Sequence, residues 1–204
     1  MYEYETKLLA KGHKHIAGTD EVGRGPLAGP LVCASVILDP LVTIEGLNDS
    51  KKLSEKKREL LNIEIKEKAL AYSVVYIDID QIDKLNIYQA SKKGMIDALH
   101  KLSIKPDYVL SDCMPLGDIP HESIVKGDSK SASIAAASII AKVERDNHMI
   151  KLGKLYPMYG FEQHKGYPTK KHIEALDKFG VLEIHRRSYK PVYERLNKQG
   201  KLDI

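Results

Sequence analysis

The sequence predicts an α/β fold built on a mixed β-sheet. Two strand-like segments stand near the start of the chain, separated by a short turn, and the second is a continuous apolar run rich in Val and Ile. Segments with helical spacing then alternate with further short strands, which is the order expected when helices pack on a sheet. With 204 residues, of which 43% are hydrophobic and 29% charged, the chain can form a packed core.

The first half of the chain supplies three of the expected strands. We expect them at the segment HIAGTDEVG, which ends at two acids, and at residues 29–38 and 72–79. Helices are expected at residues 53–71, with Ser54 as the N-cap, and at residues 86–102. The turn GRGPLA between the first two strands has several positions that favour unusual backbone conformations.

The second half supplies two short strands, residues 107–112 and 122–128, each ending on an acid. An Ala-rich helix is expected at 131–150, where small side chains allow close approach to the sheet. A further helix is expected at 169–179, with Thr169 as N-cap and Gly180 as its stop. We therefore divide the chain into a body, residues 1–150, and a mainly helical C-terminal extension packed on it, residues 151–204.

Charge is distributed unevenly along the chain. Residues 151–204 carry 12 Lys/Arg and 6 Asp/Glu, a net of +6, whereas residues 1–150 carry 20 and 22, a net of −2. This asymmetry indicates either a polyanionic partner or a solubilising surface. Two cysteines, Cys33 and Cys113, are too few for a disulfide framework. No segment has the apolar length of a signal peptide or membrane span, so we expect a cytoplasmic protein.

Four acids stand at the ends of expected strands: Asp20, Glu21, Asp112 and Asp128. Ligands of open α/β sheets bind beyond strand ends, so these carboxylates can converge on one site. Converging carboxylates repel unless a cation neutralises them, and oxygen ligands favour Mg²⁺ or Mn²⁺. Two such ions, about 4 Å apart, catalyse phosphodiester hydrolysis in known sites. Each acid alone is equally typical of a strand end or a helix cap, so the prediction depends on the four together.

The glycine-rich segment after the first acids raises its own alternatives. Asp20 and Glu21 can share a site only if the strand ends or bends there, because neighbouring strand residues point to opposite faces. The spacing Gly23-x-Gly25-x-x-x-Gly29 differs from the dinucleotide fingerprint and leads into a strand. We interpret these glycines as permitting close approach of a backbone. Arg24 is then either a phosphate contact or an ordinary turn arginine.

Four segments carry a resemblance to a known family: AGTDEVGRGPLAGPLV, DSKKLSEKKRELL, KGDSKSASIAAASIIAKVERD and HKGYPTKKH. They resemble the type 2 ribonucleases H, specifically the bacterial ribonuclease HII branch, from about Ile16 to Pro191. The resemblance implies an RNase H-like fold, with a five-stranded mixed sheet flanked by helices and a helical C-terminal part. It also implies an endonuclease that hydrolyses the RNA strand of RNA–DNA hybrids, incises at ribonucleotides embedded in duplex DNA, and leaves 5′-phosphate and 3′-hydroxyl ends.

The resemblance also implies roles for individual residues. The metal-binding acids of the family, which are expected to hold two Mg²⁺ or Mn²⁺ ions, fall on the four strand-end acids. The substrate-binding residues fall on Gly23, Arg24 and Gly25 at the RNA–DNA junction, on Asp49, Ser50 and Lys51 at a phosphate, and on Tyr167 as the junction-sensing tyrosine. One departure is Cys113, which stands where the family often has a small residue such as glycine. We expect a buried cysteine there to affect only local packing.

Several residues and alternatives remain. His164, His172 and His185 lack a metal-binding spacing, so we expect surface or phosphate contacts. The C-terminal QGKLDI faintly resembles a tail that binds a sliding clamp, although it lacks an aromatic pair.

We expect a monomer whose partners are RNA–DNA hybrid and ribonucleotide-containing duplex DNA, with no membrane. Two alternatives are a non-catalytic nucleic-acid-binding module, opposed by the four acids, and a nucleotide-dependent enzyme, opposed by the glycine spacing.

Overall fold

The computed structural model describes residues 1–199 of the chain. The strands are β1 (Ile16–Val22), β2 (Leu31–Ile37), β3 (Ala71–Ile77), β4 (Tyr108–Asp112) and β5 (His121–Ile124). The helices are α1 (Glu3–Ala10), α2 (Glu55–Lys68), α3 (Ile79–Leu85), α4 (Ile87–His100), α5 (Ala132–Leu155), α6 (Phe161–His164), α7 (Lys170–Phe179) and α8 (Lys190–Gln199), with a short 3₁₀ helix, η1, at Gly127–Ser129.

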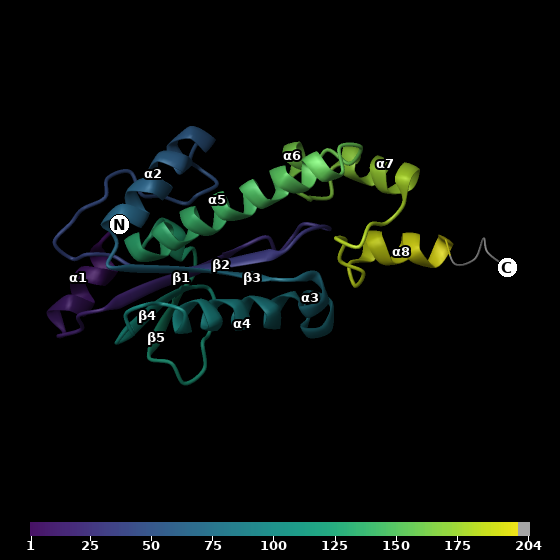
Figure 1. Cartoon of the computed structure of the whole chain (residues 1–204). Helices are drawn as coiled ribbons and strands as arrows, with labels where there is room; N and C mark the ends of the chain where they lie inside the picture. The colour runs from purple at the N-terminus through teal and green to yellow at the C-terminus, as the bar shows by residue number, and fades with distance from the viewer. Residues whose placement is uncertain (200–204) are drawn as a thin grey trace. The chain divides into compact units, whose positions relative to one another are not determined.

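The five strands form one mixed sheet in the order β3-β2-β1-β4-β5. Strand β1 pairs antiparallel with β2 and parallel with β4, and β4 pairs parallel with β5. Figure 1 shows α2 and the first half of α5 on one side of this sheet and α4 on the other. Both predictions of fold class, a mixed five-stranded sheet flanked by helices and a helical C-terminal region, are confirmed.

The described chain forms two compact units. The sheet unit comprises Met1–Val22, Val32–Tyr76 and Ser91–Val143, and the helical unit comprises Gly23–Leu31, Ile77–Ala90 and the chain from Glu144 onward. The glycine-rich loop after β1 thus groups with the C-terminal helices, which the sequence alone did not indicate. The predicted division between residues 150 and 151 stays a prediction.

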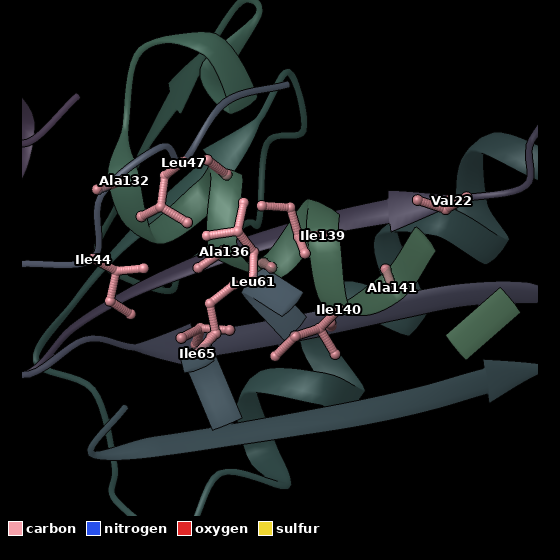
Figure 2. Close-up of a cluster of buried hydrophobic side chains, with 14 of the residues drawn as sticks. Val22, Ile44, Leu47, Leu61, Ile65, Ala132, Ala136, Ile139, Ile140 and Ala141 are labelled. Atoms are coloured by element: carbon pink, nitrogen blue, oxygen red, sulfur yellow. The ribbon is translucent and has the colours of Figure 1, made fainter. Parts of the chain in front are cut away.

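The core of the sheet unit explains the Ala-rich sequence of α5. Ala132, Ala136 and Ala141 of α5 belong to one buried cluster with Leu61 and Ile65 of α2 and with side chains of β1 and β2, and Ala136 lies beside Leu61 (Figure 2). The helix approaches β1 so closely that a Cβ at Gly18 would lie 2.0 Å from the backbone carbon of Ser133. Small residues on both elements are therefore required for α5 to lie against the sheet.

Helix ends are set largely by local capping. The Ser54 hydroxyl accepts a hydrogen bond from the Lys57 amide, and the Thr169 hydroxyl accepts one from the His172 amide, so both predicted N-caps are confirmed. Gly180 ends α7 with φ 83°, as expected for a glycine stop. At the start of α5, the Ser131 hydroxyl accepts from the Ile134 amide. This hydroxyl also donates to the buried Glu5 carboxylate of α1.

Two predicted boundaries are wrong. The strand expected at 122–128 ends at Ile124, and Asp128 lies in η1 after Lys126, whose φ is 56°. A left-handed residue turns the chain out of the extended conformation, so the strand cannot continue to Asp128. Helix α5 runs to Leu155, past the expected end at residue 150.

The helical unit has a separate core formed by residues of the glycine-rich loop and of α5 to α8. Its buried members include Leu27, Met149, Phe161, Leu176 and Val192. Tyr159 stacks on Phe161 with ring centroids 5.4 Å apart. Among the residues that the structure describes, no helix is long and apolar enough to cross a membrane.

Candidate active site

Strand β1 places the first two acids. It ends at Val22, one residue after the two acids and within the predicted segment, and Val22 pairs with Val32 of β2. The ladder between β1 and β4 ends earlier, and its last pair is Thr19 with Ser111. Asp20 is buried and its neighbour Glu21 is half-buried. Although neighbouring strand residues point to opposite faces, the charge of Glu21 still acts on Asp20 and raises its pKa.

The other two acids lie at the end of β4 and after β5. Asp112 is the last residue of β4 and follows Ser111, the partner of Thr19, so it is the strand neighbour of Asp20. The Gly127 amide donates a hydrogen bond of 2.7 Å to the Asp112 carboxylate. Asp128 comes directly after Gly127 and is 8% exposed. The short helix η1 therefore connects Asp128 to the end of β4.

Electrostatic effects connect the four carboxylates. Burial raises the pKa of Asp20 well above its ordinary value, and the charges of Glu21 and Asp112 raise it further. Burial, followed by the charges of Asp49 and Asp112, raises the pKa of Asp128 from 3.8 to about 6. Because Asp112 acts on both Asp20 and Asp128, the predicted acids form one negatively charged cluster.

The segment Asp49-Ser50-Lys51 adjoins this cluster. A hydrogen bond with Asp49 favours the protonated form of Asp128, whereas the Lys51 charge lowers the pKa of Asp128. The Ser50 side chain is buried, and its hydroxyl lies 3.0 Å from the Ser138 hydroxyl. A hydrogen bond from Ser138 in turn lowers the pKa of Asp20.

These contacts add one residue without a predicted role, Ser138, and bring Asp49, which was predicted only as part of a phosphate-contacting segment, close to an acid of the cluster. Ser138 of α5 supports the charged form of Asp20, and Asp49 acts on Asp128. The signal for Ser138 was a polar residue within an Ala- and Ile-rich helical face. No comparable local signal existed for Asp49, because its closeness to Asp128 depends on the tertiary fold.

The donor set suits a hard divalent cation. All four side chains offer carboxylate oxygens. Burial and then repulsion by neighbouring carboxylates raise the pKa of Asp20 and of Asp128, and a bound cation would lower both. Within residues 1–199, no three His, Cys, Asp or Glu side chains stand in an arrangement that could hold a metal ion. The chemistry and charge of the cluster thus fit a metal, while its carboxylates are not gathered around one point.

The predicted substrate residues of the helical unit also lie together. Gly25 and Arg24 are exposed, and a Cβ at Gly25 would lie 3.4 Å from Cε1 of Tyr167. Tyr167 is itself 36% exposed. Gly23 has φ 112°, and a Cβ there would lie 2.3 Å from Nε of the buried Arg145. A glycine is therefore required at residue 23 by both conformation and space.

The family model described as Ribonuclease HII matches residues 17–192. The chain belongs to the ribonuclease HII family. It is 57% identical over 199 residues to "Ribonuclease HII" of Bacillus cereus (strain AH820), covering 97% of this chain and 77% of the relative. A Bacillus cytotoxicus ribonuclease HII is 56% identical over 197 residues, covering 96% of this chain and 76% of the relative.

Solved structures agree with this assignment. The ribonuclease H2 of Pyrococcus horikoshii OT3 has a TM-score of 0.78 and 28% identity, covering 92% of this chain and all of that one. The ribonuclease HII in a PCNA complex from Archaeoglobus fulgidus has a TM-score of 0.72 and 27% identity, covering 87% and 96%. A Bst-RNase HIII solved with Mn²⁺, at 19% identity, TM-score 0.67 and coverage of 92% and 70%, shows the shared fold.

Membership in the ribonuclease HII family confirms the predicted enzyme class. The protein is a ribonuclease H hydrolase, a nuclease that acts on phosphodiester bonds. The predicted site residues match the family by resemblance of their motifs, and their individual roles stay predictions.

The expectation that three histidines lie on the surface of this ribonuclease HII is wrong. His164 is 9% exposed, and His172 and His185 are fully buried. Burial lowers the pKa of His172 and of His185 to about 4 in each case. His172 Nε2 and His185 Nε2 lie 3.1 Å apart, and His172 Nδ1 lies 2.9 Å from the Tyr167 carbonyl. The histidines therefore act as uncharged core residues.

The expectation for Cys113 is also wrong. Its side chain is exposed, and its φ is 50°. A left-handed backbone strongly favours glycine, which explains why a residue without a side chain suits this position after Asp112. The consequence of the cysteine is thus conformational and not a matter of core packing.

Proposed function

We propose that this ribonuclease HII cuts the RNA strand of RNA–DNA hybrids and incises at ribonucleotides embedded in duplex DNA, leaving 5′-phosphate and 3′-hydroxyl ends. The observation that carries the proposal is the cluster of four carboxylates around the end of β4. Asp20 and Asp128 in this cluster have raised pKa values for which neighbouring carboxylates are partly responsible. Such a cluster is suited to binding divalent cations and not to nucleophilic catalysis by a neutral side chain.

Asp20, Glu21, Asp112 and Asp128 are the proposed ligands of two Mg²⁺ or Mn²⁺ ions. The chemistry that two bound ions supply is activation of a water and stabilisation of the departing 3′ oxygen. Ser138 keeps Asp20 more easily ionised through its hydrogen bond. Lys51 does the same for Asp128 through its positive charge. Both effects favour the ionised carboxylates that metal binding requires.

Substrate recognition is proposed for the exposed residues of the loop and for the segment after residue 49. The 2′-hydroxyl distinguishes RNA from DNA at a given sugar, so it must be recognised directly. Gly23, Arg24, Gly25 and Tyr167 are proposed to contact the ribonucleotide. The backbone of Arg24 and Gly25 and the tyrosine ring are accessible side by side, and the buried Gly23 directly precedes them. Lys51 and Ser50 are proposed phosphate contacts, with the buried Ser50 limited to its backbone.

The remaining partners are proposals from similarity. The Archaeoglobus fulgidus relative was solved as a complex with PCNA, which makes a sliding clamp a candidate partner here. The QGKLDI segment proposed for that contact falls mainly on residues 200–204, outside the described residues. The monomeric state and the cytoplasmic location stay predictions.

A substrate panel with Mg²⁺ or Mn²⁺ tests the proposal. We expect cleavage of an RNA–DNA hybrid and of duplex DNA with one ribonucleotide, and none of an all-DNA duplex. Asp118→Asn, which changes an exposed acid of the sheet unit, is the matched control for substitutions in the cluster. Cleavage of the all-DNA duplex at a similar rate, or no metal-dependent cleavage of either ribonucleotide substrate, would contradict the proposal.

A further inference from the structure

A buried arginine holds the loop that follows β1. Arg186 is fully buried, and its hydrogen-bond partners are carbonyl oxygens and a hydroxyl. Nε and Nη2 donate to the Gly29 carbonyl at 3.1 and 2.9 Å. Nη1 donates to the Arg24 carbonyl at 3.2 Å and to the Tyr189 hydroxyl at 3.0 Å. Burying a cation among neutral acceptors contributes little to the stability of a fold. The effect of Arg186 is instead on the conformation of the loop that it binds.

Tyr189 binds the same loop carbonyl. Its hydroxyl donates a 2.5 Å hydrogen bond to the Arg24 oxygen, and the Arg186 guanidinium lies over its ring at 5.2 Å. The Arg24 carbonyl thus accepts two hydrogen bonds from residues that themselves contact each other. Two donors of fixed position determine the orientation of the peptide plane between Arg24 and Gly25.

This orientation determines where the Gly25 amide points. The described chain has no cis peptide bond, and in a trans peptide the carbonyl and the following N–H point in opposite directions. The Arg24 carbonyl points toward Arg186 and Tyr189, so the Gly25 N–H points away from them. Gly25 is exposed, and its amide donates to no acceptor among the described residues.

The surroundings of this amide suit a sugar. The position of a Cβ on Gly25 lies 3.4 Å from the ring of Tyr167, so an aromatic ring lies beside the exposed donor. Tyr167 is held in turn, because its carbonyl contacts His172 and its ring lies 6.0 Å from the buried Arg145 guanidinium. A ribose offers a hydroxyl oxygen to the amide and an apolar face to the ring.

We propose that Arg186 and Tyr189 are positioning residues that direct the Gly25 N–H toward the 2′-hydroxyl of the ribonucleotide. This inference rests on the proposed function and deepens it, because it assigns discrimination between ribose and deoxyribose to two residues that do not touch the substrate. Glycine at residue 25 then leaves the amide accessible, and Tyr167 forms the neighbouring wall.

The test compares the binding of two duplexes that differ by a single 2′-hydroxyl. Dissociation constants are measured in EDTA, which prevents cleavage, and at low salt, where duplex binding is strongest. For the wild type we expect tighter binding of the duplex with one ribonucleotide. Tyr189→Phe should lower this preference about three- to fivefold, the effect of misaligning one hydrogen bond, and leave all-DNA binding unchanged. A general loss of structure would weaken both complexes alike.

Two further variants complete the design. Tyr193→Phe changes an exposed tyrosine of α8 and should preserve the preference. Arg186→Lys cannot bind both carbonyls with a planar fork and should lower the preference at least as much as Tyr189→Phe. If the wild type binds both duplexes equally, the proposed function loses its support. If the wild type shows the preference and Tyr189→Phe retains it in full, the positioning role is wrong, whether or not Arg186→Lys folds.

Discussion

Replacing Asp128 by Asn should stabilise the metal-free protein while it weakens metal binding. Asp128 is almost buried, and burial, followed by the charges of Asp49 and Asp112, raises its pKa from 3.8 to about 6. At neutral pH the ionised carboxylate therefore lies among like charges. Asparagine removes this charge and keeps a group that can donate a hydrogen bond to Asp49.

The magnitude follows from the pKa shift. A rise from 3.8 to about 6 corresponds to about 3 kcal/mol at 1.36 kcal/mol per unit, and solvent screening reduces it to about 1–2 kcal/mol. Between pH 4 and 6 the folded state retains a proton that the unfolded state has lost, so the stability of the wild type falls as pH rises through this window. The stability of the Asp128→Asn variant does not fall in this window. The free energy of unfolding of the variant should therefore equal that of the wild type below pH 4 and exceed it by the full amount above pH 7.

Thermal unfolding in EDTA at pH 4 and pH 8 measures the effect. For a chain of this length, 1–2 kcal/mol corresponds to about 2–8 °C in Tm at pH 8. Millimolar Mg²⁺ or Mn²⁺ should then raise the Tm of the wild type more than that of Asp128→Asn, because ligand binding to the folded state is stabilising. Asp118→Asn, at an exposed position, should show neither the pH-dependent gain nor the loss of metal response.

The reasoning is refuted by either of two results. One is an Asp128→Asn protein whose Tm matches the wild type at pH 8 in EDTA, since burial and repulsion would then not oppose the ionised carboxylate. The other is a full metal response in the variant, since Asp128 would then not contribute to the metal site.

Three further outcomes are expected. Asp112→Asn should lower the hybrid cleavage rate by at least about 10³-fold, measured under single-turnover conditions with circular dichroism as a check of folding, because metal-site carboxylates supply much of the catalytic electrostatics. Ser138→Ala should move the acidic limb of the pH–rate profile to higher pH, because the lost hydrogen bond favours ionised Asp20. Gly18→Ala should lower the stability by at least about 1–3 kcal/mol in urea unfolding, because its Cβ would overlap the backbone of α5.

The strands and helices were predictable where the signal is local. Ser54 and Thr169 cap their helices with their own side chains, and the Val- and Ile-rich segment of β2 is buried along its whole length. The run at 122–128 has strand-like composition too, yet β5 ends at Ile124 and Val125 is 62% exposed. A strand persists only where a neighbour supplies hydrogen bonds, and composition alone does not show where β4 stops supplying them.

The acids of the candidate site were predictable for a reason of geometry. Parallel neighbours such as β1 and β4 bring their carboxyl ends to one edge, so acids at those ends meet whatever the intervening sequence. The supporting contacts were not predictable in this way. Asp49 and Ser138 reach the cluster from a loop and from a helix, and their positions depend on how those segments pack.

The buried Arg186 shows that the charge counted along a sequence can differ from the charge on the protein surface. Its segment is basic, which suggests a surface for a polyanion, but the irregular loop 23–31 is mostly buried and its carbonyls need donors from elsewhere. An arginine supplies five N–H donors in a fixed plane, so it can satisfy several carbonyls at once. The positive charge of Arg186 is therefore committed to the loop and is not available for direct contact with a phosphate. The net charge of the C-terminal region is therefore larger than the charge that nucleic acid can contact. The salt dependence of nucleic-acid binding should be weaker than the number of Lys and Arg residues in this region implies.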